Sequence, residues 1–157
     1  MMFEEEIEIK ASKERAWEVI SDLSRETDFW RGTRSIRVIS QSGNIVEREV
    51  TLNFGKSKVL QKLVIHPGNS IETYHVRGVI RGVKVVSLEP LSEQSTKVRV
   101  FWDIRVRGLM WFLSPWIKSH IREGTLNALR RIKSVCEGRE EELLKDRFEN
   151  RKNFPAN

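Results

Sequence analysis

Six segments between residues 33 and 107 alternate apolar and polar residues, and short turns join each segment to the next. The clearest is residues 97–107, where Val98, Trp102 and Val106 share one face with two further apolar residues and charged side chains take the other. A period of two is typical of a β-strand with one buried face. Turns of a few residues join antiparallel neighbours. This stretch therefore predicts an antiparallel meander with one packed face and one wet face.

One strand and two short helices are expected before the meander. Residues 3–9 alternate as a strand, and Ser12 is suited to cap the helix that follows. A second short helix is expected from Ser24 to about Trp30, ahead of Gly32. Together with the long helix described next, this order predicts an α+β fold.

One long helix is expected after the meander. Ser114 suits its N-cap, Pro115 its first helical position and Gly138 its end. At 1.5 Å per residue this helix would be about 35 Å long. A straight rod cannot touch a curved sheet along its whole length, so we expect a hollow between them. Gly124 falls within the apolar stripe of the helix, and a small residue there would leave room for a ligand.

The composition favours one domain that needs no disulfide. The chain has 157 residues and one cysteine, Cys136, which lies beside the apolar stripe and is expected to be a buried, inert thiol. The first residues are acidic where a secretory signal would be basic, and no apolar run approaches the ~20 residues of a membrane span. These features predict a soluble, cytoplasmic protein.

The charge is not concentrated in a way that indicates nucleic-acid binding. The formal net charge is +6, but no basic cluster is dense enough to form a footprint. Residues 139–157 form a charged tail whose apolar content is limited to Leu143, Leu144 and Phe148. Three outcomes are open for this tail: it extends the long helix, docks on a partner subunit in an oligomer, or frays. We therefore divide the chain into a domain of residues 1–138 and a helical tail of residues 139–157.

Two parts of the chain resemble the START-like (SRPBCC) helix-grip superfamily, which includes polyketide cyclase/dehydrase-like and lipid-transport-like proteins. They are the opening EEEIEIKASKERAWEVISDLSRETDFW and the closing LEPLSEQSTKVRVFWDIRVRG, with LNALRRIKSVCE after it. The resemblance covers about residues 3–137 and implies a long helix gripped by a seven-stranded curved antiparallel sheet, over a hydrophobic cavity. Members carry lipids, sterols, quinones or plant hormones, cyclise polyketides, or activate a heat-shock chaperone. Thr96 lacks the Gly that commonly precedes it, and the tail lies outside the pattern.

Templates for catalysis and metal binding are absent from the sequence. No nucleophile elbow, paired-cysteine spacing or phosphate-cradling loop is present, and His120 with Glu123 offers too few ligands for a metal. We therefore expect no metal and no cofactor. His120 is a candidate polar group inside the cavity. Tyr74 and His75 point to opposite faces of one strand, and we favour Tyr74 for the cavity because its phenol gives one directional hydrogen bond.

The candidate cavity wall combines residues of the sheet, the second helix and the long helix. The residues are Trp30, Leu52, Phe54, Tyr74, Val86, Trp102, Ile104, Leu113, Ile117, His120, Ile121 and Gly124. Aromatic residues also crowd the start of the long helix, at Trp111, Phe112 and Trp116. They either fix the helix start or form an amphipathic mouth that touches a membrane surface.

The leading hypothesis is a non-catalytic binder or carrier of a hydrophobic small molecule: a lipid, an isoprenoid or quinone, or an aromatic polyketide-like compound. An alternative is a cyclase/dehydrase-type enzyme that uses the same cavity, with acid–base chemistry by Tyr74, His120 or an arginine such as Arg48. A third class is a chaperone-type interaction module that acts through the outer sheet face and the tail. Spacing alone brings no catalytic pair together, so the three classes stay open at this point.

Overall fold

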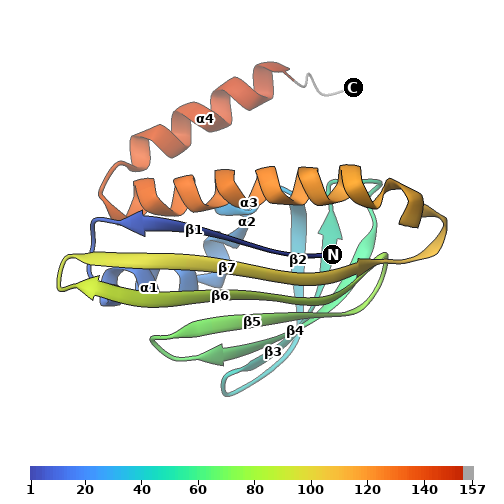
Figure 1. Cartoon of the computed structure of the whole chain (residues 1–157), viewed down its shortest axis with the longest axis horizontal. Helices are drawn as coiled ribbons and strands as arrows, with labels where there is room; N and C mark the ends of the chain where they lie inside the picture. The colour runs from blue at the N-terminus through green and yellow to red at the C-terminus, as the bar shows by residue number, and fades with distance from the viewer. Residues whose placement is uncertain (154–157) are drawn as a thin grey trace.

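A long helix lies along one side of a strongly curved sheet in the computed structural model, which describes the backbone of residues 1–153 and the side chains of residues 1–149 (Figure 1). The elements, with η for a short 3-10 helix, are β1 (Met2–Ile9), α1 (Lys13–Ser21), η1 (Leu23–Arg25), α2 (Glu26–Phe29), β2 (Thr33–Ser42), β3 (Ile45–Leu52), β4 (Lys58–His66), β5 (Ser70–Arg77), β6 (Ile80–Ser92), β7 (Ser95–Val106), η2 (Gly108–Leu113), α3 (Ser114–Cys136) and α4 (Glu140–Asn153). The expected α+β helix-grip fold is confirmed. The expected second helix is split into η1 and α2, and β6 continues past Pro90.

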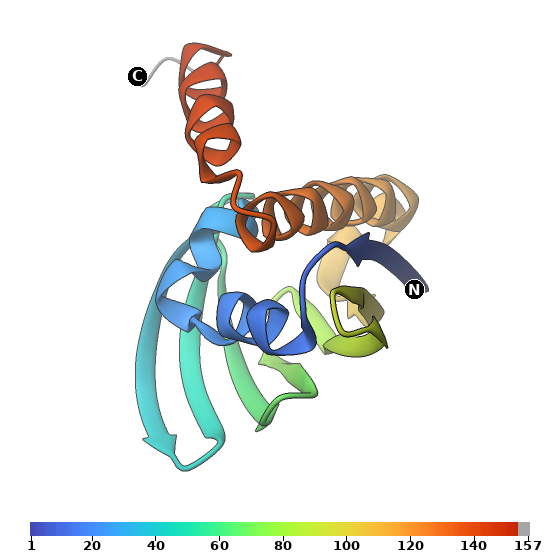
Figure 2. The same ribbon diagram turned by 90° about the vertical axis from the view of Figure 1, so that its left-hand side faces the viewer.

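The sheet is antiparallel throughout the described residues. Its seven strands follow the order β1-β7-β6-β5-β4-β3-β2, so the N-terminal strand closes the meander by pairing with the last strand. The apolar phase of β7 is buried, as its alternation predicts: Val98, Val100 and Ile104 are fully enclosed. The sheet curls around α1, and α3 closes the open side next to β1 (Figure 2).

Two local signals for helix ends are confirmed. The Ser12 side chain accepts a hydrogen bond from the backbone N–H of Arg15 (3.1 Å) and caps α1. Gly138 adopts φ +76°, a left-handed conformation that glycine takes at little cost, and the chain leaves α3 there. Ser114 differs from its prediction: it is already helical, and its hydroxyl donates to the carbonyl of Trp111 in η2.

Gly82 is required by the close approach of two strands rather than by a turn. It lies within β6, opposite His75 of β5 and Ile104 of β7, with φ +128°. A Cβ atom there would lie 2.8 Å from the Cα atom of Ile104 and closer still to the carbonyl oxygen of Asp103. Only glycine fits this position, because the obstacle is backbone that cannot move aside.

The two halves of α3 have different environments. From Thr125 to Cys136 the helix packs its apolar residues into the core, and the Cys136 thiol is buried as expected. Burial raises the pKa of this thiol to about 11. No residue between Ser114 and Gly124 is fully buried. The prediction that Gly124 lies in a buried stripe is wrong: it is exposed, and a Cβ atom there would meet none of the described heavy atoms within 4 Å.

Gly124→Ala is expected to stabilise the protein by about 1 kcal/mol, because alanine restricts the unfolded chain and suits a helix interior. Urea unfolding followed by circular dichroism measures the change. Gly138→Ala is the matched control, and it should destabilise by about 1 kcal/mol since the same methyl group meets a left-handed backbone. A loss of stability in Gly124→Ala would show that the helix depends on glycine there.

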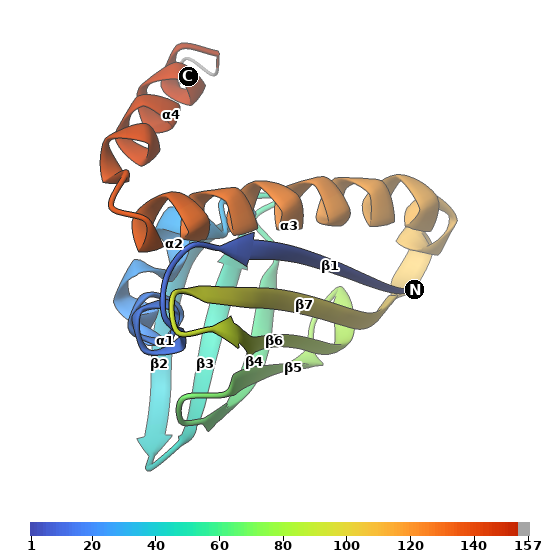
Figure 3. The ribbon, with the colours of Figure 1, turned by 60° about the vertical axis from the view of Figure 1, so that its left-hand side comes forward.

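The tail forms a separate helix that docks on its own chain. α4 turns away from α3 after Gly138 and projects from the domain (Figure 3). Leu143 is buried at its base, and the Asp146 carboxylate accepts from Arg131 (2.9 Å) and pairs with Arg31 (3.0 Å). The tail does not extend the long helix, which was one of its three expected outcomes, because α3 ends at Cys136. None of the helices within residues 1–153 is long and apolar enough to cross a bilayer.

Candidate functional site

Charged and polar side chains occupy the middle of the inner sheet face. Arg48 of β3, Gln61 of β4, His75 of β5 and Lys84 of β6 are all buried there, and Glu26 reaches them from the first turn of α2. A buried ionised group is costly unless it is paired, so this cluster needs a specific arrangement. We call these five residues the polar floor.

Glu26 and Arg48 form the fixed part of the polar floor. The guanidinium donates Nη1 to Oε2 (2.5 Å) and Nη2 to Oε1 (2.8 Å) of the carboxylate, and Nε donates to Gln61 Oε1 (2.8 Å). Burial by itself would raise the pKa of Glu26. The hydrogen bonds from Arg48 and the charge of Lys84 outweigh it and hold the pKa below its usual value. Glu26 is therefore ionised at neutral pH.

Lys84 lies between the carboxylate and two aromatic rings. Its Nζ atom is 3.8 Å from Glu26 Oε1, 4.0 Å from the ring centroid of Trp30 and 5.6 Å from that of Trp102. Burial lowers the pKa of the ammonium to about 8; Glu26 opposes this shift and Arg48 adds to it. Lys84 is thus mostly protonated at pH 7. Because Arg48 and Lys84 share one carboxylate, the polar floor holds one positive charge in excess.

His75 completes the polar floor as a neutral group. Its ring lies 5.8 Å from that of Trp102, and its Nδ1 atom is buried without a hydrogen-bond partner among the described residues. Burial, assisted by the charge of Lys84, lowers the pKa of His75 to about 4. An unpartnered ring nitrogen in a buried site is able to take a hydrogen bond from, or give one to, an incoming molecule.

Trp102 links the polar floor to α3. Its indole Nε1 donates to Thr125 Oγ1 (3.1 Å), and the Thr125 hydroxyl donates to the carbonyl of Ile121 one turn earlier (2.8 Å). Trp30 meets Trp102 edge to face, with ring centroids 6.4 Å apart. These contacts hold α3 at the point where its packed half begins.

The cavity beside Glu26 and Lys84 of the polar floor is small. A cavity of about 30 Å³ lies between α1, α2 and the inner strands, and Trp30, Thr73, Lys84 and Val86 contribute to its wall. This volume suits one or two water molecules, whereas drug-sized ligands occupy pockets of about 300 Å³ or more. A cavity large enough for a lipid or polyketide therefore stays a prediction, and it requires the site to widen.

The predicted wall residues divide into three groups, and their contact with a ligand stays a prediction. The first group lies inside: Trp30 and Val86 line the small cavity, and Trp102 and Ile104 are buried on the inner face. The second group is half-buried and consists of Leu52 of β3, Leu113 at the end of η2, and Ile117 and Ile121 of α3.

The third group lies at the rim or outside. Phe54, in the turn after β3, packs on Trp116 (ring centroids 6.0 Å apart), and Trp116 stacks on His120 (5.6 Å), all three being exposed. Exposed Gly124 follows one turn later on α3. The prediction that Tyr74 faces the cavity is wrong. Its hydroxyl donates to Glu72 on the outer face (2.8 Å), which leaves His75 as the inward residue of that strand.

Sequence reasoning missed most of the polar floor, although a signal for it exists. Arg48 lies on the same strand face as Val46 and Val50, two positions from each. Gln61 likewise has an apolar residue two positions before it and two positions after it. A charged residue in the buried phase of a strand is rare without a functional or structural reason. Among the described residues, no group of three or more His, Cys, Asp or Glu side chains is placed to hold a metal ion.

Comparisons with known proteins agree with this architecture. The sequence model of the family described as polyketide cyclase / dehydrase and lipid transport matches residues 2–137. Similar solved structures include the Zhui aromatase/cyclase from Streptomyces sp. R1128 (TM-score 0.74, 12% identity, 88% of this chain and 94% of that one). Others are norcoclaurine synthase from Thalictrum flavum in complex with dopamine and hydroxybenzaldehyde (0.65, 16%, 88% and 87%) and a START superfamily protein from Mycobacterium smegmatis (0.61, 17%, 90% and 98%). No curated protein matches this chain in sequence. At these identities the structural likeness shows the fold alone.

Proposed function

The chain belongs to the polyketide cyclase / dehydrase and lipid transport family, and on this basis we propose that it binds a hydrophobic, aromatic small molecule carrying an acidic oxygen. The molecule would lie between the inner sheet face and α3, above the polar floor. A phenol, an enol or a carboxylate supplies the required oxygen. This proposal narrows the range of lipid, isoprenoid or polyketide-like ligands that the fold accommodates.

The observation that carries the proposal is the excess positive charge beside two tryptophan rings. Among the described side chains, Glu26 is the one carboxylate paired with Lys84, and it is shared with Arg48; the Trp30 and Trp102 rings flank the ammonium. A ligand anion placed here would offset the cost of the buried charge. Its apolar body would replace water on the aromatic walls, at roughly 25 cal/mol per Å² of buried area.

The first half of α3 supplies a route for the ligand. No residue from Ser114 to Gly124 is fully buried, and Ile121 is the residue of this half that packs against the core, so the turns before Ile121 can move without breaking the core. Phe54, Trp116 and His120 form the aromatic rim there. The hydrogen bond from Trp102 to Thr125 marks where the moving part would end.

Lys84→Met is expected to weaken binding of 2-naphthoate by about tenfold or more, because it removes the charge partner while keeping the apolar stem. Isothermal titration calorimetry with 2-naphthoate and with uncharged naphthalene measures the effect, which should be confined to the anion. Lys62→Met is the matched control, since Lys62 is exposed on β4. Equal binding of 2-naphthoate by the Lys84 variant would reject the proposal. Native mass spectrometry followed by solvent extraction identifies a natural ligand.

A second candidate is a cyclase/dehydrase-type enzyme acting on the same ligand class. It is favoured by a candidate base and a candidate acid in the same site. His75 is neutral with an unpartnered Nδ1, and Lys84 is protonated with a pKa of about 8. A base and an acid with separated pKa values are what proton transfer requires. Turnover of the extracted ligand, lost in His75→Gln, would select this candidate over a carrier.

Three expectations about location and partners stay predictions: a cytoplasmic location, self-association through the tail and contact with a membrane surface. Self-association would use Leu144 and Phe148, which are exposed on α4.

A further inference from the structure

An apolar segment protrudes beyond the end of the sheet. It comprises η2 and the first turn of α3, and its large side chains are mostly exposed: Leu109 by 87%, Trp111 by 68% and Phe112 by 64%. Figure 1 shows this segment, in orange, reaching past β7 at the end of the molecule opposite to α4. A contiguous group of exposed apolar side chains is typical of a surface that meets a partner.

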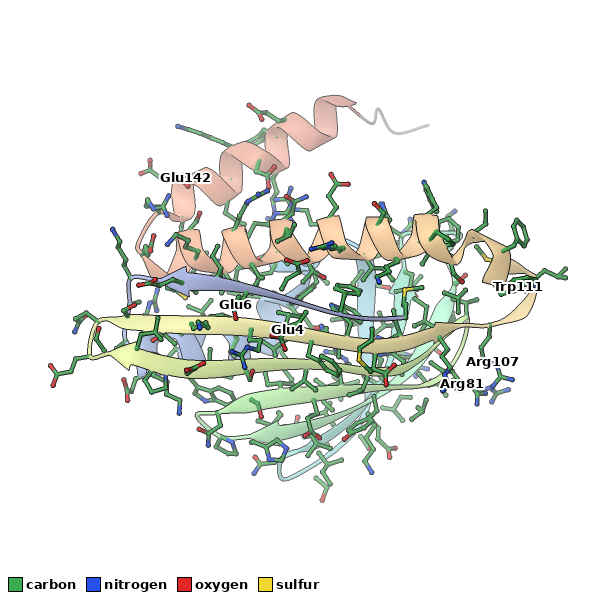
Figure 4. The ribbon with its side chains drawn as sticks, in the orientation of Figure 1. Glu4, Glu6, Arg81, Arg107, Trp111 and Glu142 are labelled. Atoms are coloured by element: carbon green, nitrogen blue, oxygen red, sulfur yellow. The ribbon has the colours of Figure 1, made fainter. Side chains whose placement is uncertain are left out.

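Arginines lie beside the apolar segment. Arg81 of β6 and Arg105 of β7 are direct cross-strand neighbours, and Arg107 follows at the end of β7. All three are exposed, and none forms an ion pair with the described side chains of residues 1–149. Figure 4 shows Arg81, Arg107 and Trp111 at the same end of the molecule. Like charges placed directly opposite each other repel, so this arrangement favours an anionic partner.

We propose that this end of the protein docks on a bilayer rich in anionic phospholipid. Leu109, Trp111 and Phe112 insert at the level of the headgroups and upper acyl chains, and the arginines bind lipid phosphates. Tryptophan is favoured at membrane interfaces, and arginine makes bidentate contacts to phosphate. Docking on a bilayer does not require a ligand in the site above the polar floor, so either proposal can fail alone.

The shape of the apolar segment favours a bilayer over a nucleic acid. Stacked bases need aromatic rings along a basic groove, whereas here the rings protrude at the end of the molecule. Leu109 and Phe112 have no hydrogen-bonding group with which to read a polar partner. Insertion into the headgroup region satisfies both the apolar side chains and the arginines beside them.

Sedimentation of the full chain with vesicles tests the proposal. With 70% phosphatidylcholine and 30% phosphatidylglycerol we expect binding that weakens with salt, and much weaker binding to pure phosphatidylcholine. Trp111→Ala combined with Phe112→Ala, and Arg81→Glu combined with Arg107→Glu, should each lower the partition coefficient about tenfold or more. These positions are exposed, and circular dichroism checks that the variants fold.

The matched control reverses the same number of charges at the other end of the molecule, with Lys10→Glu and Lys145→Glu, and should bind vesicles as the unmodified protein does. The apolar control replaces Leu144 and Phe148 of α4 with alanine and should also leave binding unchanged. Failure of the unmodified protein to bind the anionic vesicles would overturn the proposal. Equal loss in the controls would do so too, as would binding to a single-stranded oligonucleotide that depends on the same residues and exceeds vesicle binding.

Discussion

Glu26→Gln is expected to lower the free energy of unfolding by about 3–5 kcal/mol, the usual cost of breaking a buried ion pair by removing one partner. The amide keeps the shape of the side chain but removes the negative charge that is paired with both Arg48 and Lys84. Two buried cations are then left near each other without a counter-ion. Urea unfolding at pH 7, followed by circular dichroism, measures the loss.

Two further variants test whether the loss of stability in Glu26→Gln comes from the broken buried ion pair rather than from the Glu-to-Gln change itself. Glu18→Gln breaks an exposed pair with Arg15 and should cost less than about 0.5 kcal/mol. The double variant with Arg48→Met and Glu26→Gln should be more stable than Glu26→Gln alone. It replaces both members of the ion pair, so Arg48 is no longer left as a buried cation without a counter-ion. A cost below about 1 kcal/mol for Glu26→Gln alone would show that water screens the polar floor.

Local patterns predicted most of the fold because they report on single elements. The alternation in β7 gives its buried face, Ser12 marks the start of α1 and Gly138 the end of the last core helix. The start of α3 was harder to predict from the sequence. η2 adds a six-residue 3-10 helix before α3, and Ser114 then becomes a helical residue rather than a cap.

The site was harder to predict because it depends on how far one element extends over another. The stripe on α3 is apolar along its length, but full burial begins only at Thr125, and Gly124 is exposed. In β5 the alternation separates Tyr74 from His75 without showing which of them faces inward. Thr73 shares a face with His75, and neither face of that strand is clearly apolar.

The polar floor was not predicted from the sequence, which indicated a mainly apolar pocket with Tyr74 and His120 as its polar groups. Arg48 and Lys84 lie 22 and 58 residues after Glu26 of α2 in the sequence, and the three meet only after the sheet has curled around α1 and α2. On the inner faces of their strands they alternate with apolar residues such as Val46, Val50 and Val86, which predict a hydrophobic wall. The pairing of charges across the grip is a property of the tertiary fold.

His75 is expected to make the protein lose about 3 kcal/mol of stability as the pH falls from 6.5 toward 4. Its pKa is about 4 in the folded protein against 6.5 for an ordinary histidine, because burial and the charge of Lys84 disfavour the imidazolium. Between these values the unfolded chain binds a proton that the folded protein does not. Protons therefore favour unfolding in this window, and stability rises again as the pH is raised.

His75→Gln should remove most of this pH dependence, since glutamine is polar but does not titrate. The readout is the difference in unfolding free energy between pH 6.5 and 4.5, which is insensitive to a constant loss from the substitution itself. Carboxylates held below their usual pKa, such as Glu26 and Glu137 (about 2), weaken the fold only at lower pH. His66→Gln is the control, because His66 is exposed at the end of β4 and its substitution should leave the pH dependence intact. An unchanged slope in His75→Gln would mean that the imidazole is protonated inside the folded protein, and the neutral acceptor proposed for the site would be lost with it.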